Sequence, residues 1–197
     1  YAPENHYARK NAGYIEAIKR GAESIYDTDD DNIPSAIWMP REVNCFGFEV
    51  EDKGWCNIYC FFTKRKVWAR GFPLEEIKNI KKYLLPVFTN KDSSIQQGLA
   101  DVSPDVDAVF RLTDKEEFFF EETRSIWLGK NTWSPFNSQS TWWFPKAYPL
   151  MYLPVTAPFR MTDIWRGFVA QRCLWEIGEG VTFYSPSEVY QIRNEHN

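Results

Sequence analysis

The segment Asp27-Thr28-Asp29-Asp30-Asp31 concentrates four carboxylates directly after a short strand-like run at 24–26. Carboxylate oxygens are hard ligands of the kind that hold Mg²⁺ or Mn²⁺, and such an ion in turn holds a diphosphate. Alternate residues of an extended chain point the same way, so Asp29 and Asp31 can act together while Asp30 faces elsewhere. A solvated acidic turn is the alternative, but like charges this close repel one another unless a cation lies among them. The run is therefore a candidate divalent-metal site.

The elements around this run predict an α/β fold with a mixed sheet, because helix, strand and acidic loop are followed by mixed strands and helices. In such sheets ligands bind beyond the carboxyl ends of the strands, which is where the acidic run lies. The apolar periodicity predicts helices over 7–20, 73–84 and 163–176, and strands over 24–26, 45–50, 58–63, 106–112 and 181–184. Many aromatic residues and five prolines make 127–160 a stretch of loops and short strands, and the tail 187–197 is polar.

Length and charge exclude several classes of protein. The 197 residues suit one domain, 1–197, which is long enough to bury a core. A net charge of −4 argues against broad binding to nucleic acid or to an anionic membrane. No apolar run approaches the ~20 residues that a membrane span needs, so the chain itself is expected to have no membrane span.

The cysteines and aromatic residues allow two further expectations. The four cysteines do not complete a zinc set, and no N-x-S/T sequon is present, which together favour a cytoplasmic setting. Aromatic residues make up 17% of the chain. Most of them are expected in the core, and a few could stack on the face of a sugar.

The blocks within 7–32 resemble the segment before and through the DxD motif of GT-A glycosyltransferases and are most similar to the STELLO-type glycosyltransferase-like family. The resemblance to this family continues in blocks between 134 and 197. Matched blocks span nearly the whole chain, which makes them specific as a set, although a lone DxD would be weak. The blocks are Tyr7-Ala8-Arg9-Lys10-Asn11-Ala12-Gly13-Tyr14, Ala17-Ile18, Gly21-Ala22, Tyr26-Asp27-Thr28-Asp29-Asp30-Asp31-Asn32, Ser134-Pro135-Phe136-Asn137-Ser138-Gln139-Ser140-Thr141, Leu153-Pro154-Val155, Arg160-Met161-Thr162-Asp163, Arg166-Gly167, Gln171-Arg172, Leu174-Trp175-Glu176-Ile177-Gly178 and Arg193-Asn194-Glu195-His196-Asn197.

The resemblance implies a role for residues on the donor side. Asp29 and Asp31 would be the DxD pair, with Asp31 the better metal ligand and Asp29 nearer the donor ribose, and His196 would be a further metal ligand. The groups that meet the donor nucleotide or its phosphates would be Arg9, Lys10, Asn11, Asp29 and Asp30. Without the resemblance, Arg9 and Lys10 could be a solvated helix face, and His196 a frayed terminal residue.

The resemblance also implies an acceptor side. Asp163 lies where inverting GT-A enzymes place a carboxylate at a helix start, and it would take the proton from the acceptor hydroxyl. A helix cap or a partner of the helix dipole is the alternative. The donor sugar or acceptor would be met by Asn137, Ser138, Gln139, Trp133, Trp142 and Arg166. Alternatively, Asn137, Ser138 and Gln139 could simply form hydrogen bonds within a loop. The two tryptophans could instead pack in the core.

One departure from the family pattern concerns the nucleoside base. A GT-A domain normally begins with a strand and a helix that hold the base, and here that unit is absent, very short or outside the chain. The donor and metal half would occupy about 1–60, and the acceptor and catalytic half about 105–197. If the chain is part of a larger membrane-anchored protein, the Golgi lumen replaces the cytoplasm as the expected location.

The function implied is a metal-dependent glycosyltransferase with Mn²⁺ or Mg²⁺, a UDP-hexose donor and a glycan or glycoprotein acceptor, acting with inversion. The alternative is a non-catalytic GT-A-like module that binds sugar, nucleotide or a partner protein. A metal-dependent phosphohydrolase also fits an aspartate cluster, but it usually needs more histidine than His6 and His196.

Overall fold

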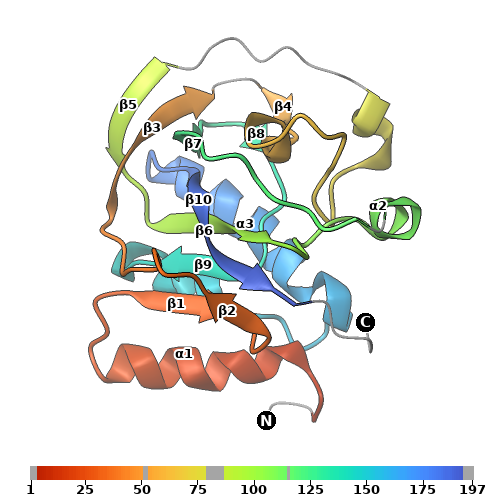
Figure 1. Ribbon diagram of the computed structural model, residues 1–197. Helices are drawn as coiled ribbons and strands as arrows, with labels where there is room; N and C mark the ends of the chain where they lie inside the picture. The colour runs from red at the N-terminus through yellow and green to blue at the C-terminus, as the bar shows by residue number, and fades with distance from the viewer. Residues whose placement is uncertain (1–3, 51–52, 79–86, 115, 193–197) are drawn as a thin grey trace.

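The computed structural model describes residues 4–50, 53–78, 87–114 and 116–192, which form one large mixed sheet with helices around it (Figure 1). The strand order is β1-β9-β6-β10-β7-β3-β5, and β2 pairs with β10. The pairs β6/β10 and β3/β7 are parallel and the others in this sheet are antiparallel. This confirms the predicted α/β class with a mixed sheet. The strands of this sheet are β1 (Ile25–Thr28), β2 (Asn32–Pro34), β3 (Asn44–Val50), β5 (Val87–Asp92), β6 (Ile95–Asp101), β7 (Ser125–Leu128), β9 (Ser140–Trp143) and β10 (Val181–Gln191).

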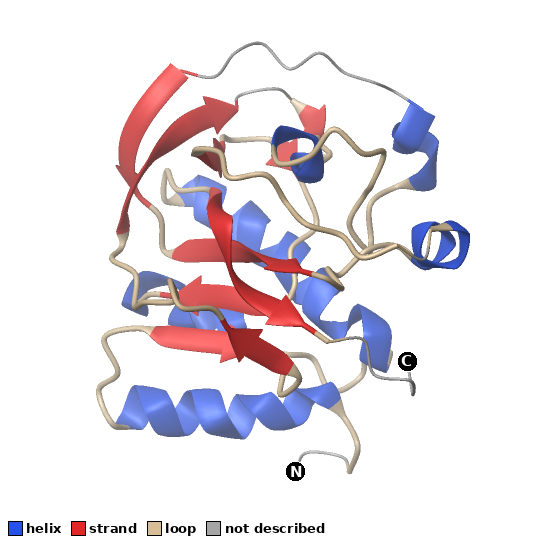
Figure 2. Cartoon of the chain, viewed as in Figure 1, coloured by secondary structure: helices blue, strands red, loops and turns tan. Residues whose placement is uncertain are grey.

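Helical segments and a small second sheet complete the described chain (Figure 2). The second sheet pairs β4 (Gly54–Trp55) with β8 (Thr132–Trp133) in parallel. The α-helices are α1 (Lys10–Lys19), α2 (Ala108–Thr113) and α3 (Thr162–Glu176). Short 3₁₀ helices are η1 (Tyr7–Arg9), η2 (Ile58–Phe61), η3 (Leu74–Lys78), η4 (Pro145–Met151) and η5 (Phe159–Met161). In the described residues no helix is long and apolar enough to cross a membrane.

The large sheet is covered on both faces. Neighbouring residues of a strand point to opposite faces, and the adjacent rings Trp142 and Trp143 of β9 belong to different clusters. Trp143 lies in the main core, which includes Tyr14 of α1 and Leu174 of α3. Trp142 lies in a smaller cluster against Trp38, whose ring stacks on it at a centroid distance of 5.7 Å. Helices therefore cover one face, and the loop that carries Trp38 covers part of the other.

Three strands bring their carboxyl ends to the same edge of the sheet. Both β1 and β6 run antiparallel to β9, and β10 runs parallel to β6, so β1, β6 and β10 share one direction. The acidic run begins in the last two residues of β1 and continues beyond the end of the strand at this edge. Ligand sites in α/β proteins form at such edges, as the sequence predicts for the acidic run.

The strands predicted over 58–63 and 106–112 are wrong. The first is the 3₁₀ helix η2, and the second is mostly the helix α2. Short apolar runs do not distinguish a strand from a buried helical turn. For α2 the local signal is Asp107, whose side chain accepts a hydrogen bond from the amide of Val109 and caps the helix.

The central strand β6 lies in a stretch where no strand was predicted, and β10 is longer than the strand predicted over 181–184. The sequence does not predict β6 because Gln96 and Gln97 are polar and interrupt its apolar pattern, although both are buried in the structure. The Gln96 side chain donates to the carbonyl of Glu42 at 2.7 Å, and the Gln97 side chain donates to the carbonyl of Ser140 at 3.1 Å. Buried amides that are paired in this way are compatible with a core strand.

The helices predicted over 7–20 and 163–176 are confirmed as η1 with α1 and as α3. On α1, however, Ile15 and Ile18 are exposed, while Tyr14 is buried. Of the helix predicted over 73–84, the described part is η3, and 79–84 lies outside the described residues.

Candidate active site

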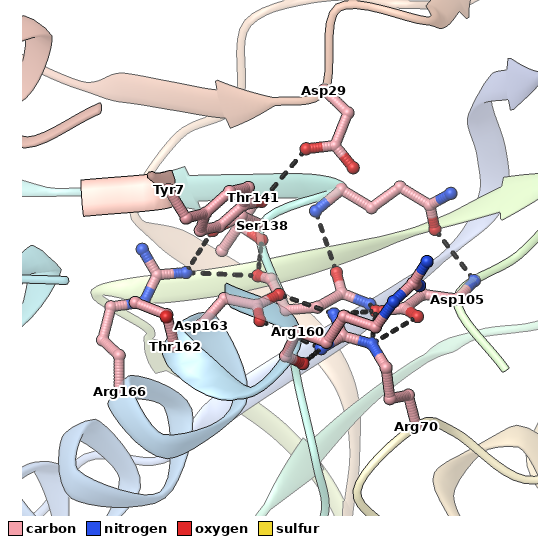
Figure 3. A network of polar contacts seen from close by, with 12 residues as sticks. Tyr7, Asp29, Arg70, Asp105, Ser138, Thr141, Arg160, Thr162, Asp163 and Arg166 are labelled. Atoms are coloured by element: carbon pink, nitrogen blue, oxygen red, sulfur yellow. Dashed lines mark hydrogen bonds and ion pairs between the residues drawn. The ribbon is translucent and has the colours of Figure 1, made fainter. Parts of the chain in front are cut away.

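A polar pocket of about 150 Å³ lies at the edge where β1, β6 and β10 end. Its walls come from segments that are far apart in the sequence, including both of the predicted halves. The lining residues are Tyr7, Asp29, Arg70, Asp105, Arg111, Gln139, Phe159, Arg160, Asp163 and Gln191. The pocket thus brings Asp29 of the acidic run together with Asp163 at the start of α3, and Figure 3 shows the contacts around them.

Asp29 lies in this pocket as a partly buried carboxylate. Its Oδ1 accepts hydrogen bonds from the Tyr7 hydroxyl at 3.1 Å and from Lys10 Nζ at 3.3 Å. Burial raises the pKa of Asp29 to about 6, although Lys10 and Tyr7 oppose the shift. Burial and the neighbouring Asp29 carboxylate raise the pKa of Tyr7 well above its usual value, so Tyr7 stays a neutral hydrogen-bond donor.

Asp31 and Asp30 follow Asp29 in different environments. Asp31 Oδ1 accepts a 2.5 Å hydrogen bond from Gln191 Nε2, and Gln191 lines the pocket at the end of β10. Asp30 is exposed. Asp31 is therefore tied to the pocket wall through Gln191, while Asp30 faces away from it.

Asp27, the first carboxylate of the run, is fully buried and paired with two cations. Arg166 Nη1 lies 3.1 Å from its Oδ2, and Lys10 Nζ lies 2.9 Å from its Oδ1. Burial alone would raise the pKa of Asp27, but Arg166 and Lys10 outweigh it and hold the pKa below its usual value. Lys10 also donates to the carbonyl of Thr28 at 2.9 Å. Asp27 and its partners thus fix the shape of the turn that carries Asp29.

The acidic run offers carboxylate oxygens, which are the type of donor that divalent ions prefer. Among the described residues, no three His, Cys, Asp or Glu side chains lie together as a ready metal cage. Mg²⁺ is often held by one or two carboxylates with substrate phosphates and water rather than by a protein cage. Asp29 and Asp31 are two carboxylates of this type, and in the structure the cation that contacts Asp29 is Lys10. His196 lies outside the described residues.

Asp163 is the second residue of α3 and is buried. Met161 occupies the N-cap position and no side chain caps this helix, so Asp163 is not its cap. Both of its carboxylate oxygens accept from Arg70, at 3.1 Å for Nη1 to Oδ1 and 2.8 Å for Nη2 to Oδ2. Asp163 is therefore a buried carboxylate that lines the pocket at the positive end of a helix, with both of its oxygens held by Arg70.

The segment 137–139 holds the walls of the pocket together. Asn137 Nδ2 donates to Asp105 Oδ2 at 2.9 Å, and Gln139 Nε2 donates to the side chain of Gln191 at 2.8 Å. Ser138 Oγ accepts from Arg166 at 2.6 Å. Gln139 is the member of this trio that lines the pocket. The contacts of Asn137, Ser138 and Arg166 are with protein groups behind it.

Arg9, Lys10 and Asn11, which were predicted to contact the donor nucleotide, do not all lie at one pocket. Arg9 is exposed and, with Lys10, lines a second, more open pocket of about 430 Å³. This pocket adjoins the first, since Tyr7 and Phe159 line both. Asn11 instead pairs with the backbone of Leu153, donating at 2.8 Å and accepting at 2.9 Å.

The two tryptophans predicted for the sugar do not line either pocket. Trp142 is buried against Tyr26 and Trp38 on the far face of the sheet. Trp133 packs on Trp175 at a centroid distance of 4.3 Å. Their surroundings match the core-packing alternative.

The sequence pattern did not single out several lining residues. Asp105 follows β6, and because the polar β6 was not predicted, the position of Asp105 at a strand end was not visible either. Arg160 belongs to a block that carries the family resemblance, but its place beside the pocket comes from the fold. Arg70 and Gly71 form a turn against α3, and the paired aspartates of Arg70 are distant in sequence.

Replacing Gly71 with Ala tests how closely this turn packs on α3. Gly71 has φ +85°, and a Cβ there would lie 2.6 Å from Cγ2 of Ile164. The variant should lose about 1–3 kcal/mol of unfolding free energy, measured by urea denaturation. Gly13→Ala is the matched control, because nothing lies within 4 Å of its Cβ position in α1, and it should gain about 0.5–1 kcal/mol. Equal stability of Gly71→Ala and wild type would contradict the close packing.

The comparisons with known proteins place the chain beside two plant proteins. No family model matches the chain. The curated protein "Probable glycosyltransferase STELLO1" from Arabidopsis thaliana is 34% identical over 95% of the chain, and "Probable glycosyltransferase STELLO2" from the same plant is 32% identical over 95%. The chain spans 27% of the length of each of these relatives. The α/β architecture with its mixed sheet agrees with the GT-A-like domain that the resemblance implies. Over the part of these relatives that it spans, the chain is similar to the STELLO-type glycosyltransferase-like proteins.

Proposed function

We propose that this chain forms the catalytic part of a glycosyltransferase that moves a sugar from a nucleotide-sugar donor to an acceptor hydroxyl. The observation that carries the proposal is the pocket shared by Asp29 and Asp163 at the carboxyl ends of β1, β6 and β10. The names of the two relatives support the same class of reaction. The finer proposal is a UDP-hexose donor, a glycan or glycoprotein acceptor, and inversion at the anomeric carbon.

The donor side rests on the acidic run and on the residues around Tyr7. Asp29 and Asp31, with His196, would hold Mn²⁺ or Mg²⁺, and such an ion neutralises the leaving nucleoside diphosphate. Lys10 holds the 27–29 turn through its contacts with Asp27 and Asp29. Arg9, exposed in the adjoining pocket, is a cation available to the nucleotide.

The acceptor side rests on Asp163. Its carboxylate accepts the proton of the acceptor hydroxyl while the acceptor oxygen bonds to the anomeric carbon. The bond from that carbon to the donor phosphate oxygen breaks on the opposite face, so the configuration inverts. The polar pocket that Asp29 and Asp163 both line would bring the reacting groups of the two substrates together for this displacement.

The test is incubation of the protein with a panel of nucleotide-sugars and Mn²⁺, with and without glycan acceptors. Release of nucleoside diphosphate that depends on an acceptor, with a product of inverted configuration, supports the proposal. A product of retained configuration would still support transferase activity, but it would contradict the proposed role of Asp163 as the base.

A metal role for the acidic run predicts that UDP binds markedly more tightly with Mn²⁺ or Mg²⁺ than without. Asp31→Ala should abolish this gain in calorimetry, because it removes a ligand. Asp30→Ala is the control, since Asp30 is exposed, and it should keep the gain. His196→Ala tests the third ligand in the same titration. Equal UDP affinity with and without metal in the wild-type protein would end the DxD assignment.

A non-catalytic module that binds sugar, nucleotide or a partner protein is the second candidate. The observation that favours it is the contact of Arg70 with both oxygens of Asp163, which engages the proposed base. UDP binding without transfer to any acceptor in the panel would select this candidate.

A further inference from the structure

The side chain of Arg70 bridges two aspartates through two adjacent edges of its planar guanidinium, and its Nη2 contacts both of them (Figure 3). Nε donates to Asp105 Oδ1 at 2.8 Å, and Nη2 donates to Asp105 Oδ2 at 2.6 Å. Nη1 and Nη2 reach the two oxygens of Asp163, and Nη1 also donates to the carbonyl of Arg160. The two carboxylates raise the pKa of Arg70 above its usual value in spite of its burial, so the guanidinium stays charged.

Asp105 is anchored in its turn, so it holds Arg70 in a fixed place. Its carboxylate accepts from Asn137 Nδ2 at 2.9 Å, and its amide donates to Gln139 Oε1 at 3.1 Å. Its carbonyl accepts from the Tyr59 hydroxyl at 3.2 Å and from the Arg70 amide at 3.3 Å. A continuous chain of contacts therefore runs from Asn137 through Asp105 and Arg70 to Asp163.

Resting on the proposed function, we infer that Arg70, held by Asp105, is a positioning residue that fixes the direction in which the Asp163 carboxylate meets the acceptor hydroxyl. A carboxylate rotates about its terminal bond unless both oxygens are engaged, and Arg70 engages both. Each oxygen keeps further lone-pair capacity for the acceptor, since a carboxylate offers about four acceptor positions. Reaction rates depend steeply on such alignment, so holding one rotamer matters for transfer more than for donor affinity.

The guanidinium fork is the feature that this role needs. One planar group with donors on two edges can bind both oxygens of two carboxylates at once. A lysine ammonium at the same place is a point charge that cannot pair with both oxygens of Asp105 and both oxygens of Asp163 in this way. Arg70→Lys therefore keeps the charge and removes the alignment.

The test measures transfer rate and UDP affinity for Arg70→Lys and Arg70→Met, with folding checked by circular dichroism. Both variants should bind UDP as wild type does and transfer sugar roughly 10²-fold more slowly. Arg65→Met is the matched control: Arg65 also pairs with an aspartate, Asp114, but neither residue lines the pocket, and its transfer rate should stay near that of wild type. If Arg70→Met does not fold, Arg70→Lys and Asp105→Asn carry the same measurement.

A double-mutant cycle separates positioning from general damage. If Arg70 acts through Asp163, adding Arg70→Lys to Asp163→Asn should cause little further loss of transfer. A loss of equal size in both backgrounds would overturn the inference, as would wild-type transfer by Arg70→Lys. Absence of transfer by the wild-type protein with every donor would instead overturn the proposed function, and the inference with it.

Discussion

Asp163→Asn is expected to lower the rate of sugar transfer by roughly 10²–10⁴-fold while UDP affinity stays nearly constant. A general base contributes in the transition state and little to ground-state binding. Asparagine keeps the shape of the side chain and one oxygen that can accept from Arg70, but it cannot take the acceptor proton. Transfer assays and UDP titration on the same variant measure the two quantities separately.

Asp107→Asn is the matched control for this substitution. Asp107 also lies at a helix start, and there its side chain does cap the helix, accepting from the amide of Val109 at 2.8 Å. Asparagine caps about as well as aspartate, so Asp107→Asn should change neither stability nor transfer appreciably. If Asp163→Asn transfers at the wild-type rate, Asp163 is not the base.

Arg166→Met is expected to lower the free energy of unfolding by about 3–5 kcal/mol. The side chains of Arg166 and Asp27 are each 1% exposed, and their ion pair spans 3.1 Å. Removing one partner leaves the other charge buried, with Lys10 as the remaining cation beside Asp27. The loss of stability is large because Asp27 remains buried away from water while its attraction to Arg166 is gone.

Urea denaturation of three variants checks this expectation. Arg172→Met breaks an exposed ion pair with Glu176 one helical turn away, and it should cost less than about 0.5 kcal/mol. Adding Asp27→Leu to Arg166→Met should recover part of the loss, since both charges are then gone. A cost below about 1 kcal/mol for Arg166→Met would show that the pair does not hold the turn.

Much of the frame around the site could be predicted from local pattern. The helices at 7–20 and 163–176 carry their own signals, because helical periodicity and terminal glycines such as Gly178 act over a few residues. The position of Asp29 at a strand end followed from the same local reasoning. These features depend on neighbours in sequence, so a single sequence contains them.

The contacts among Arg70, Asp105 and Asp163, which line the pocket, could not be predicted in this way. Arg70 meets Asp105 and Asp163, which are 35 and 93 residues away, and no local period links such positions. Asp105 follows β6, and β6 does not look like a buried strand in the sequence because it contains Gln96 and Gln97. Both side chains are buried in the structure, where they donate hydrogen bonds to backbone carbonyls that are distant in sequence. Trp142 shows the same limit: its ring type suits sugars, but the pleat of β9 turns it to the other face of the sheet, which the sequence does not reveal.

The position of β10 has a consequence for how the chain reaches its native state. This strand is the last described one along the sequence, yet it lies inside the sheet and pairs with β2, β6 and β7. During synthesis the edges of β6 and β7 that face it have no partner until Val181–Gln191 has left the ribosome. Unpaired edges invite pairing with other chains, and contacts between distant parts of a sequence form slowly. The facing edges of β6 and β7 therefore stay open to other chains until this closing strand inserts, and only then does Gln191 complete the wall of the pocket.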